Sequence, residues 1–86
     1  NISITREQMA AIIYRYAKYK GYDINVGTNA GYKDTDDISE YAANAVDWAA
    51  EKGIMTGDTE GKFEPKTSTT RAQTAAVLMR ISENFR

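Results

Sequence analysis

One helical segment is present twice in this chain. Residues 4–16 align without a gap with residues 69–81, and Thr, Arg, Gln, two Ala and a second Arg are identical in the two copies. Repeats of this kind are typical of proteins in which a small unit cannot bury its apolar face alone and stacks on its neighbours. The repeat therefore predicts a module built from helical units.

Both copies begin with the same signal for a helix start. Thr5 and Thr70 are candidate N-caps, and each is followed three residues later by a glutamine, Gln8 or Gln73, as in a capping box. We predict helices over about 5–20 and 70–84. Residues at helical spacing form an apolar face in each: Ile12, Ile13, Tyr16 and Ala17 in the first, and less completely Ala75, Leu78, Met79 and Ser82 in the second.

A third helix is predicted before Gly53. Asp37 or Ser39 can cap its start, and Gly53 can end it with Ile54 folded back, as in a Schellman motif. Its periodic residues are Tyr41, Ala42, Ala45, Val46, Trp48 and Ala49. The Gly- and Asn-containing stretch 21–31 predicts a loop, and 57–65 a tight turn. The expected fold is all-α, with three main helices and ordered loops.

The composition excludes several classes of function. The 86 residues include neither Cys nor His, so disulfides, Cys-based zinc sites and Ser-His-Asp or Cys-His catalysis are excluded. A net charge of −1 argues against nucleic-acid binding, and no apolar run approaches the length of a membrane span. The acidic runs 34–37 and 58–61 do not fit a calcium loop and are better explained as turns and caps. We expect no metal, no cofactor and no enzymatic activity, because so small a helical unit is a poor host for a catalytic cleft.

The repeated arginines are the residues that point to a ligand. Arg6 and Arg71 occupy the first helical position, where a cation opposes the helix dipole by some tenths of a kcal/mol. A guanidinium beside free backbone N–H groups suits a carboxylate or a phosphate. The alternative is that each arginine pairs with an acidic side chain of a neighbouring turn, namely Asp34, Asp36, Asp37 or Asp58.

Six tyrosines and one tryptophan offer flat faces on which sugar rings stack. Aromatic residues at helical spacing in a small helical domain are, however, more often part of the core. Trp48 is the strongest core candidate.

The run from Tyr32 to Ile81 resembles the S-layer homology motif. It opens with Tyr32-Lys33-Asp34, continues through an Ala-rich helix that ends in Glu51-Lys52-Gly53-Ile54, and then has Thr56-Gly57, the segment 61–65 and Thr70-Arg71-Ala72-Gln73. By this resemblance, residues 32–86 form a complete motif. Residues 1–20 look like the closing helix of a partial preceding motif, and 21–31 is the linker loop.

The resemblance implies a noncovalent anchor of a bacterial surface protein, located outside the cell at the cell wall. Such modules bind acidic secondary cell-wall polysaccharide, commonly through a pyruvylated sugar, and three motifs usually form a pseudo-threefold helical unit. The family's Thr-Arg signature implies that Arg71 and Arg6 contact the ligand. The candidate binding site comprises Arg71, Arg6, Thr70, Thr5, Gly57, Asp34 and Tyr41.

The sequence departs from the family pattern at two places. Gln8 and Gln73 replace the signature glutamate, which keeps the capping box but removes a negative charge beside the arginine. Tyr41 stands where the family usually has Trp.

An assembly module without glycan binding is the alternative function. Ile12, Ile13 and Tyr16 have no assured partner within this chain, and exposed apolar stripes are usually covered by association. We therefore expect a homo-oligomer, a dimer or a trimer, or contacts with neighbouring motifs of a parent chain.

Overall fold

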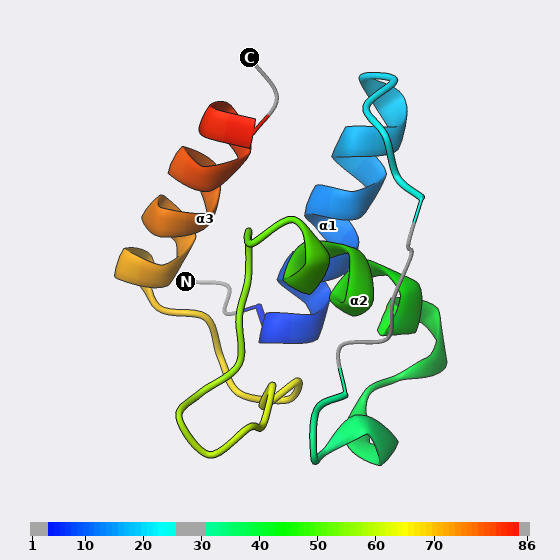
Figure 1. Ribbon diagram of the computed structural model, residues 1–86. Helices are drawn as coiled ribbons and strands as arrows, with labels where there is room; N and C mark the ends of the chain where they lie inside the picture. The colour runs from blue at the N-terminus through cyan, green and yellow to red at the C-terminus, as the bar shows by residue number, and fades with distance from the viewer. Residues whose placement is uncertain (1–3, 26–30, 85–86) are drawn as a thin grey trace.

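The structure is a computed structural model that describes residues 4–25 and 31–84 (Figure 1). In chain order the elements are α1 (Arg6–Tyr19), the short 3-10 helices η1 (Thr35–Asp37) and η2 (Glu40–Ala42), α2 (Ala43–Glu51) and α3 (Arg71–Asn84). Within the described residues the only β-type pairing is an isolated bridge between Thr5 and Ser68. The expected all-α class is confirmed.

Helix α1 has the ends that its sequence predicts. The Gln8 N–H donates to Thr5 Oγ1 at 3.2 Å, and the Thr5 N–H donates to Gln8 Oε1 at 2.7 Å, so the capping box is complete. At the other end Gly21 has a φ of +78°, and the Tyr22 N–H donates to the Ala17 carbonyl at 2.9 Å. This is a Schellman ending, which requires a left-handed residue that glycine adopts without strain.

Helix α2, the helix predicted before Gly53, ends as predicted but begins differently. The Ile54 N–H donates to the Ala49 carbonyl at 2.8 Å after a left-handed Gly53, as in a Schellman motif. The predicted cap by Asp37 or Ser39 is wrong, because the chain enters α2 through η2 and neither side chain caps a helix. The Ser39 hydroxyl donates to the Glu7 carboxylate at 2.7 Å instead, since this buried acid on α1 is a stronger acceptor.

The core lies where α1 crosses α2. Alanines on both helices allow the backbones to approach closely, and the two largest buried side chains, Trp48 and Phe63, fill the space around them. The Trp48 indole N–H donates to the Asp23 carbonyl at 2.9 Å, which ties the chain after α1 to α2. The expectation that Trp48 is a core residue is confirmed. Truncating an aromatic side chain this deeply buried removes about 3–5 kcal/mol of stability.

The predicted apolar face of α1 is divided in the structure. Ile13 and Ala17 are buried against α2, whereas Ile12 and Tyr16 remain about half exposed, at 50% and 46%. Helix α2 covers only the Ile13 and Ala17 side of this apolar face. The side with Ile12 and Tyr16 is therefore available for contact with another group.

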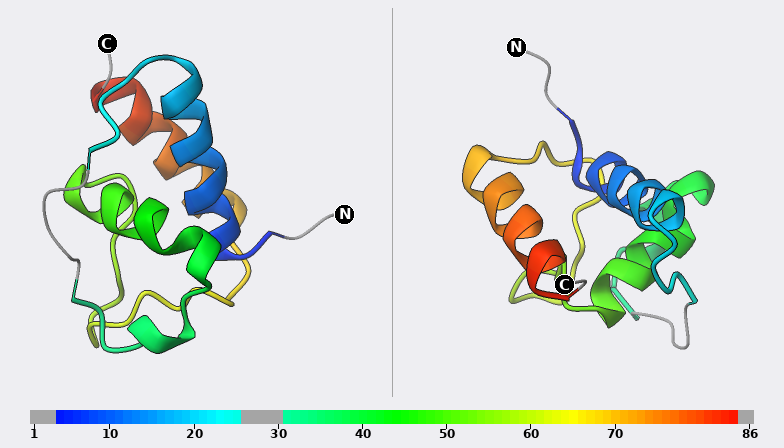
Figure 2. Two further views of the ribbon diagram at one scale, coloured as in Figure 1. Left: turned by 90° about the vertical axis from the view of Figure 1, so that its right-hand side faces the viewer. Right: turned by 90° about the horizontal axis from the view of Figure 1, so that it is seen from above.

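Helix α3 stands apart from the other helices, as Figure 2 shows. No Cα of α3 lies within 8 Å of a Cα of another described helix. Its predicted apolar face is wrong: Leu78 is 59% exposed and Met79 63%, while Val77 is the buried residue. The reason is that α3 has no described helix beside it and turns Val77 toward the loop that follows α2. None of the described helices is both long and apolar enough to cross a membrane.

Candidate functional site

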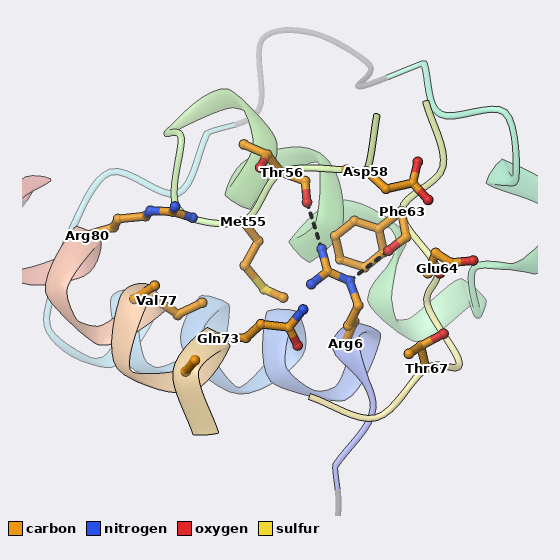
Figure 3. Close-up of a pocket in the computed structure, with 13 residues that line it drawn as sticks. Arg6, Met55, Thr56, Asp58, Phe63, Glu64, Thr67, Gln73, Val77 and Arg80 are labelled. Atoms are coloured by element: carbon orange, nitrogen blue, oxygen red, sulfur yellow. Dashed lines mark hydrogen bonds between the residues drawn. The ribbon is translucent and has the colours of Figure 1, made fainter. Parts of the chain in front are cut away.

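A cavity of about 410 Å³ lies between the start of α1, the loop after α2 and one side of α3 (Figure 3). Pockets that bind small molecules typically have volumes of roughly 300–1,000 Å³, so there is room for a sugar-sized group. The lining residues come from three separate parts of the chain: Arg6, Met55, Thr56, Gly57, Asp58, Phe63, Glu64, Thr67, Ala72, Gln73, Ala76, Val77 and Arg80.

The Arg6 guanidinium is held at the wall of this cavity by backbone carbonyls. Its Nε donates to the Phe63 carbonyl and its Nη2 to the Thr56 carbonyl, each at 2.7 Å. The guanidinium carbon also lies 4.8 Å from the centre of the Phe63 ring, in a cation–π contact. These contacts fix the direction of the planar fork before any ligand arrives.

The alternative of an ion pair between Arg6 and a neighbouring acid is not what holds this arginine. The ion pairs among the described residues are Lys52 with Asp23 and Lys66 with Glu7. Partial burial lowers the pKa of Arg6, and the nearby Tyr32 and the surrounding acidic groups oppose that shift. With its Nε and Nη2 bound to carbonyls, Arg6 has an Nη1 that makes no hydrogen bond to any described residue.

Asp34 supports the loop that Arg6 binds. Its two carboxylate oxygens accept the N–H groups of Phe63 at 2.9 Å and of Glu64 at 2.8 Å. Burial raises the pKa of Asp34, but these hydrogen bonds outweigh it and hold the pKa below its usual value. Asp34 thus fixes the peptide that carries the Phe63 carbonyl, although it does not itself line the cavity.

The second acidic run also forms a turn. Asp58 Oδ1 accepts the N–H groups of Glu60 and Lys62, both at 2.9 Å. This is the role that the sequence predicts for such residues. In the part of the chain that the structure describes, no group of three or more acidic, His or Cys side chains is placed to hold a metal ion.

Gly57 lines the cavity at a point where no side chain fits. A Cβ there would lie 2.5 Å from Tyr32 Cε1 and 2.8 Å from the Lys62 carbonyl. The Tyr32 ring packs against Phe63, with 5.3 Å between the ring centres. Burial raises the pKa of the Tyr32 hydroxyl. The aromatic residue that opens the motif therefore shapes the loop behind the cavity.

A buried acid outside the cavity joins α1 to the rest of the domain. Glu7 is only 3% exposed. It accepts the Ser39 N–H at 2.8 Å, and the Ser39 hydroxyl and the Lys66 ammonium at 2.7 Å each. Burial raises the pKa of Glu7, but these hydrogen bonds and the charge of Lys66 lower the pKa by more than burial raises it. The pKa of Glu7 is therefore below its usual value.

Sequence reasoning did not single out Glu7, although one signal was available. The second copy of the repeat has Ala72 at the corresponding position, so the acid is a difference between two otherwise similar helices. Tyr41 belongs to this cluster: the residue is 62% exposed, and its hydroxyl donates to Glu7 Oε2 at 3.4 Å.

The structure brings two of the seven candidate residues to the cavity, Arg6 and Gly57. Thr5 and Thr70 cap their helices, and Arg71 is exposed at the start of α3. The roles of all seven residues in binding stay predictions.

Arg80 is a charged cavity residue that sequence reasoning missed. Its Nη1 donates to the Ile54 carbonyl at 3.1 Å, and it lines the cavity from α3. The available signal was that the repeat contains a second identical arginine, Arg15 in the first copy and Arg80 in the second.

Comparison with known proteins gives one family match and several relatives. A family model described as "S-layer homology domain" matches residues 31–75. An endoglucanase of Bacillus sp. strain KSM-635 is 39% identical over 79 residues, which is 91% of this chain and 8% of that protein. An amylopullulanase of Thermoanaerobacterium thermosulfurigenes is 39% identical over 87 residues, 96% of this chain and 4% of that protein.

Another relative carries a name that refers to anchoring. The "cellulosome-anchoring protein" of Acetivibrio thermocellus is 37% identical over 86 residues, which is 96% of this chain and 18% of that protein. The chain spans less than a fifth of the length of each of these three relatives. No solved structure matches the chain.

Proposed function

Because this chain belongs to the S-layer homology domain family, we propose that it is a noncovalent anchoring module that binds an acidic polysaccharide of the bacterial cell wall. The relatives named as a cellulosome-anchoring protein and as a cell surface glycoprotein support a location at the cell surface. Other relatives are much longer enzymes, which suits a module that anchors a catalytic domain and does not itself catalyse.

The position of Arg6 is the observation that carries this proposal. Its guanidinium is fixed on two carbonyls at the wall of the cavity and keeps Nη1 donors for a ligand. Charge-assisted hydrogen bonds from a fixed guanidinium favour a carboxylate, such as the one carried by a pyruvylated sugar. In Figure 3 the carboxylates of Asp58 and Glu64 point away from the space between Arg6 and Gln73.

Retention on purified cell-wall sacculi tests the proposal. Sacculi are prepared from the bacterium that carries the cellulosome-anchoring relative and from the Bacillus that carries the endoglucanase, each with and without the secondary polymer. We expect the chain to sediment with at least one of the intact preparations and to stay in solution with the stripped ones. Equal retention on intact and stripped sacculi, or no retention on either, would contradict the proposed function.

Two arginine variants at equivalent positions locate the binding site. We expect Arg6→Ala and Arg71→Ala each to weaken retention by about 1.5–3 kcal/mol, the scale of a hydrogen bond to a charged group. A thermal melt of each variant reports whether it is folded. Because Arg71 is exposed, its removal does not disturb the core, and a lysine there should restore only part of the binding. Unchanged retention by both folded variants would remove the arginines from the site.

An assembly function is the second candidate, and one observation favours it. An apolar cavity of about 490 Å³ lies between α1 and α3, and most of its lining is apolar: Ile12, Ile13, Tyr16, Tyr22, Leu78, Ile81 and Ser82. The α3 residues Thr74, Leu78 and Ser82 correspond in the repeat to Met9, Ile13 and Ala17, which α1 buries against α2.

The occupant that fits the open face of α3 is residues 32–67 of a second copy of the chain. In each chain this segment already packs on α1, and α3 repeats the sequence of α1. Arg71 would then meet carbonyls of the second copy, as Arg6 meets those of Phe63 and Thr56. The variant Arg71→Ala distinguishes wall binding from assembly. In an assembly module it changes the oligomeric state, whereas in a binding module it lowers the affinity for the wall.

A further inference from the structure

The donors that bind the buried Glu7 carboxylate come from the segment 32–67, which packs on α1. The Ser39 N–H donates to Oε1 at 2.8 Å, and the Ser39 hydroxyl and the Lys66 ammonium donate to Oε2 at 2.7 Å each. Ser39 lies 32 positions and Lys66 59 positions from Glu7 in the sequence. The carboxylate is therefore a contact between α1 and a distant part of the chain.

The other contacts at the start of α1 use groups that α3 also has. The Arg6 N–H donates to the Thr67 carbonyl at 2.9 Å, and the Glu7 N–H donates to the Pro65 carbonyl at 3.1 Å. These donors are backbone groups, which every residue except proline supplies. The Thr-Arg start and its capping box are repeated in α3. The Glu7 carboxylate is thus the charged part of this contact that the second copy lacks.

Ala72 occupies the position of Glu7 in the second copy of the repeat, and it is exposed. If the segment 32–67 of another chain packs on α3, its Ser39 and Lys66 donors meet a methyl group at this point. Donors that are taken out of water without an acceptor destabilise a complex, and such groups are a common means of discriminating between partners. A helix start without the acid is therefore the poorer partner for this segment.

We propose that Glu7 is the specificity-determining residue by which the segment 32–67 selects its helical partner. The segment accepts a Thr-Arg helix start that is followed by an acidic residue, and it discriminates against one that is followed by alanine. The arginine and the capping box are common to both helices of the repeat, whereas the acid distinguishes them. This inference concerns the pairing of helices with the segment and does not depend on wall binding.

The experiment measures the binding of one chain to another. A labelled E7Q chain, whose segment 32–67 has lost its acidic partner, is titrated with unlabelled A72E, A72Q or unaltered chain, and complex formation is followed by sedimentation velocity. Ala72 is exposed, so substitutions there leave the core of the unlabelled chain intact. We expect A72E to bind about tenfold to a hundredfold more tightly than A72Q, because glutamine has a similar shape but lacks the charge that Lys66 binds.

An unlabelled T59E chain is the control for the added charge. Thr59 is exposed in a turn, so this variant has the same net charge as A72E without an acid at the helix start. It should bind the labelled E7Q chain no more tightly than the unaltered chain does.

A charge reversal tests the same contact from the side of the segment and leaves Glu7 in place. The Lys66 side chain is 60% exposed, so K66E changes the charge without removing a core residue. A labelled K66E chain should bind A72K most tightly, A72Q less tightly and A72E most weakly. A residue that only stabilised the fold would not reverse the order of A72Q and A72E, since these unlabelled chains are the same in both titrations.

Two results would overturn the inference. One is equal binding of the labelled E7Q chain to A72E and A72Q, which includes the absence of binding to both. The other is a K66E chain that does not prefer A72K to A72E. Thermal melts show whether each labelled chain is folded, and the K66E titration decides alone if E7Q is not.

Discussion

Arg6 and Arg71 occupy the same position of the repeat but have different surroundings. Arg6 donates to two loop carbonyls and stacks on Phe63, whereas Arg71 is exposed because no described loop lies over the start of α3. The arginine at the first helical position is unfavourable for an isolated helix. The contacts of Arg6 show what offsets this: the residue joins α1 to carbonyls that lie 50 and 57 positions away in sequence.

Glu7 makes the free energy of unfolding of the module dependent on pH. Because its pKa in the folded state lies below the usual value, its contribution is fully present above the pKa of about 4.3 expected in the unfolded chain. It is lost as the pH falls through the folded-state pKa. We expect Glu7→Gln to reduce the free energy of unfolding by about 2 kcal/mol at pH 7 and by much less at pH 3. Urea denaturation of both proteins at the two pH values measures the difference.

Glu40→Gln is the control for this prediction, since Glu40 is exposed and no described side chain binds its carboxylate. It should change stability by only a few tenths of a kcal/mol at either pH. If the loss caused by Glu7→Gln were the same at pH 7 and pH 3, the assigned hydrogen bonds would not be those of a carboxylate.

At the scale of elements, α1 and α3 share their capping box and differ in packing. We expect Thr5→Ala to lower the global stability of the domain by about 1 kcal/mol, because α1 forms the core with α2. Thr70→Ala removes the equivalent capping hydrogen bond of α3. Because α3 lies apart from the other helices, this substitution should mainly increase fraying of α3. Thermal melts report the first effect, and amide hydrogen exchange along α3 reports the second.

Thr59→Ala, in an exposed turn without a capping role, serves as the reference for both cap variants. Equal losses of global stability in Thr5→Ala and Thr70→Ala would mean that α3 is as firmly packed as α1.

The features that sequence predicts well in this protein are local ones. The capping boxes at Thr5 and Thr70 and the glycine endings at Gly21 and Gly53 depend on residues a few positions apart, and they form as predicted. The start of α2 does not, because Ser39 is recruited by Glu7, 32 positions away.

The candidate site was only partly predictable for the same reason. The repeat pointed to Arg6, and the resemblance to a known motif pointed to Gly57. Both residues line the cavity. Arg80 and Gln73 reach it because α3 turns that side toward the loop after α2. Hydrophobic periodicity alone predicted a different face, since Leu78 and Met79 are more apolar than Gln73 and Arg80.

At the scale of the whole molecule, the exposed apolar side of α3 predicts self-association. We expect the chain to sediment as a dimer or trimer at micromolar concentration, and Leu78→Asp to convert it to a monomer without a large loss of stability, since Leu78 is 59% exposed. Tyr19→Asp is the control, because Tyr19 is 86% exposed and does not line the cavity between α1 and α3. A monomeric unaltered chain, or equal association of the unaltered chain and Leu78→Asp, would contradict this docking face.

The hydrogen bonds from Arg6 to Phe63 and Thr56 have a consequence for how such modules can be recombined. By the division into motifs that the sequence predicts, α1 closes one motif, and it supplies an arginine and a buried acid to residues of the next. A crossover placed at this predicted boundary, between residues 20 and 31, therefore separates groups that fold together. A graft into another protein should instead keep each Thr-Arg helix with the half-motif that follows it, and exchange partners ahead of Thr5 or ahead of Thr70.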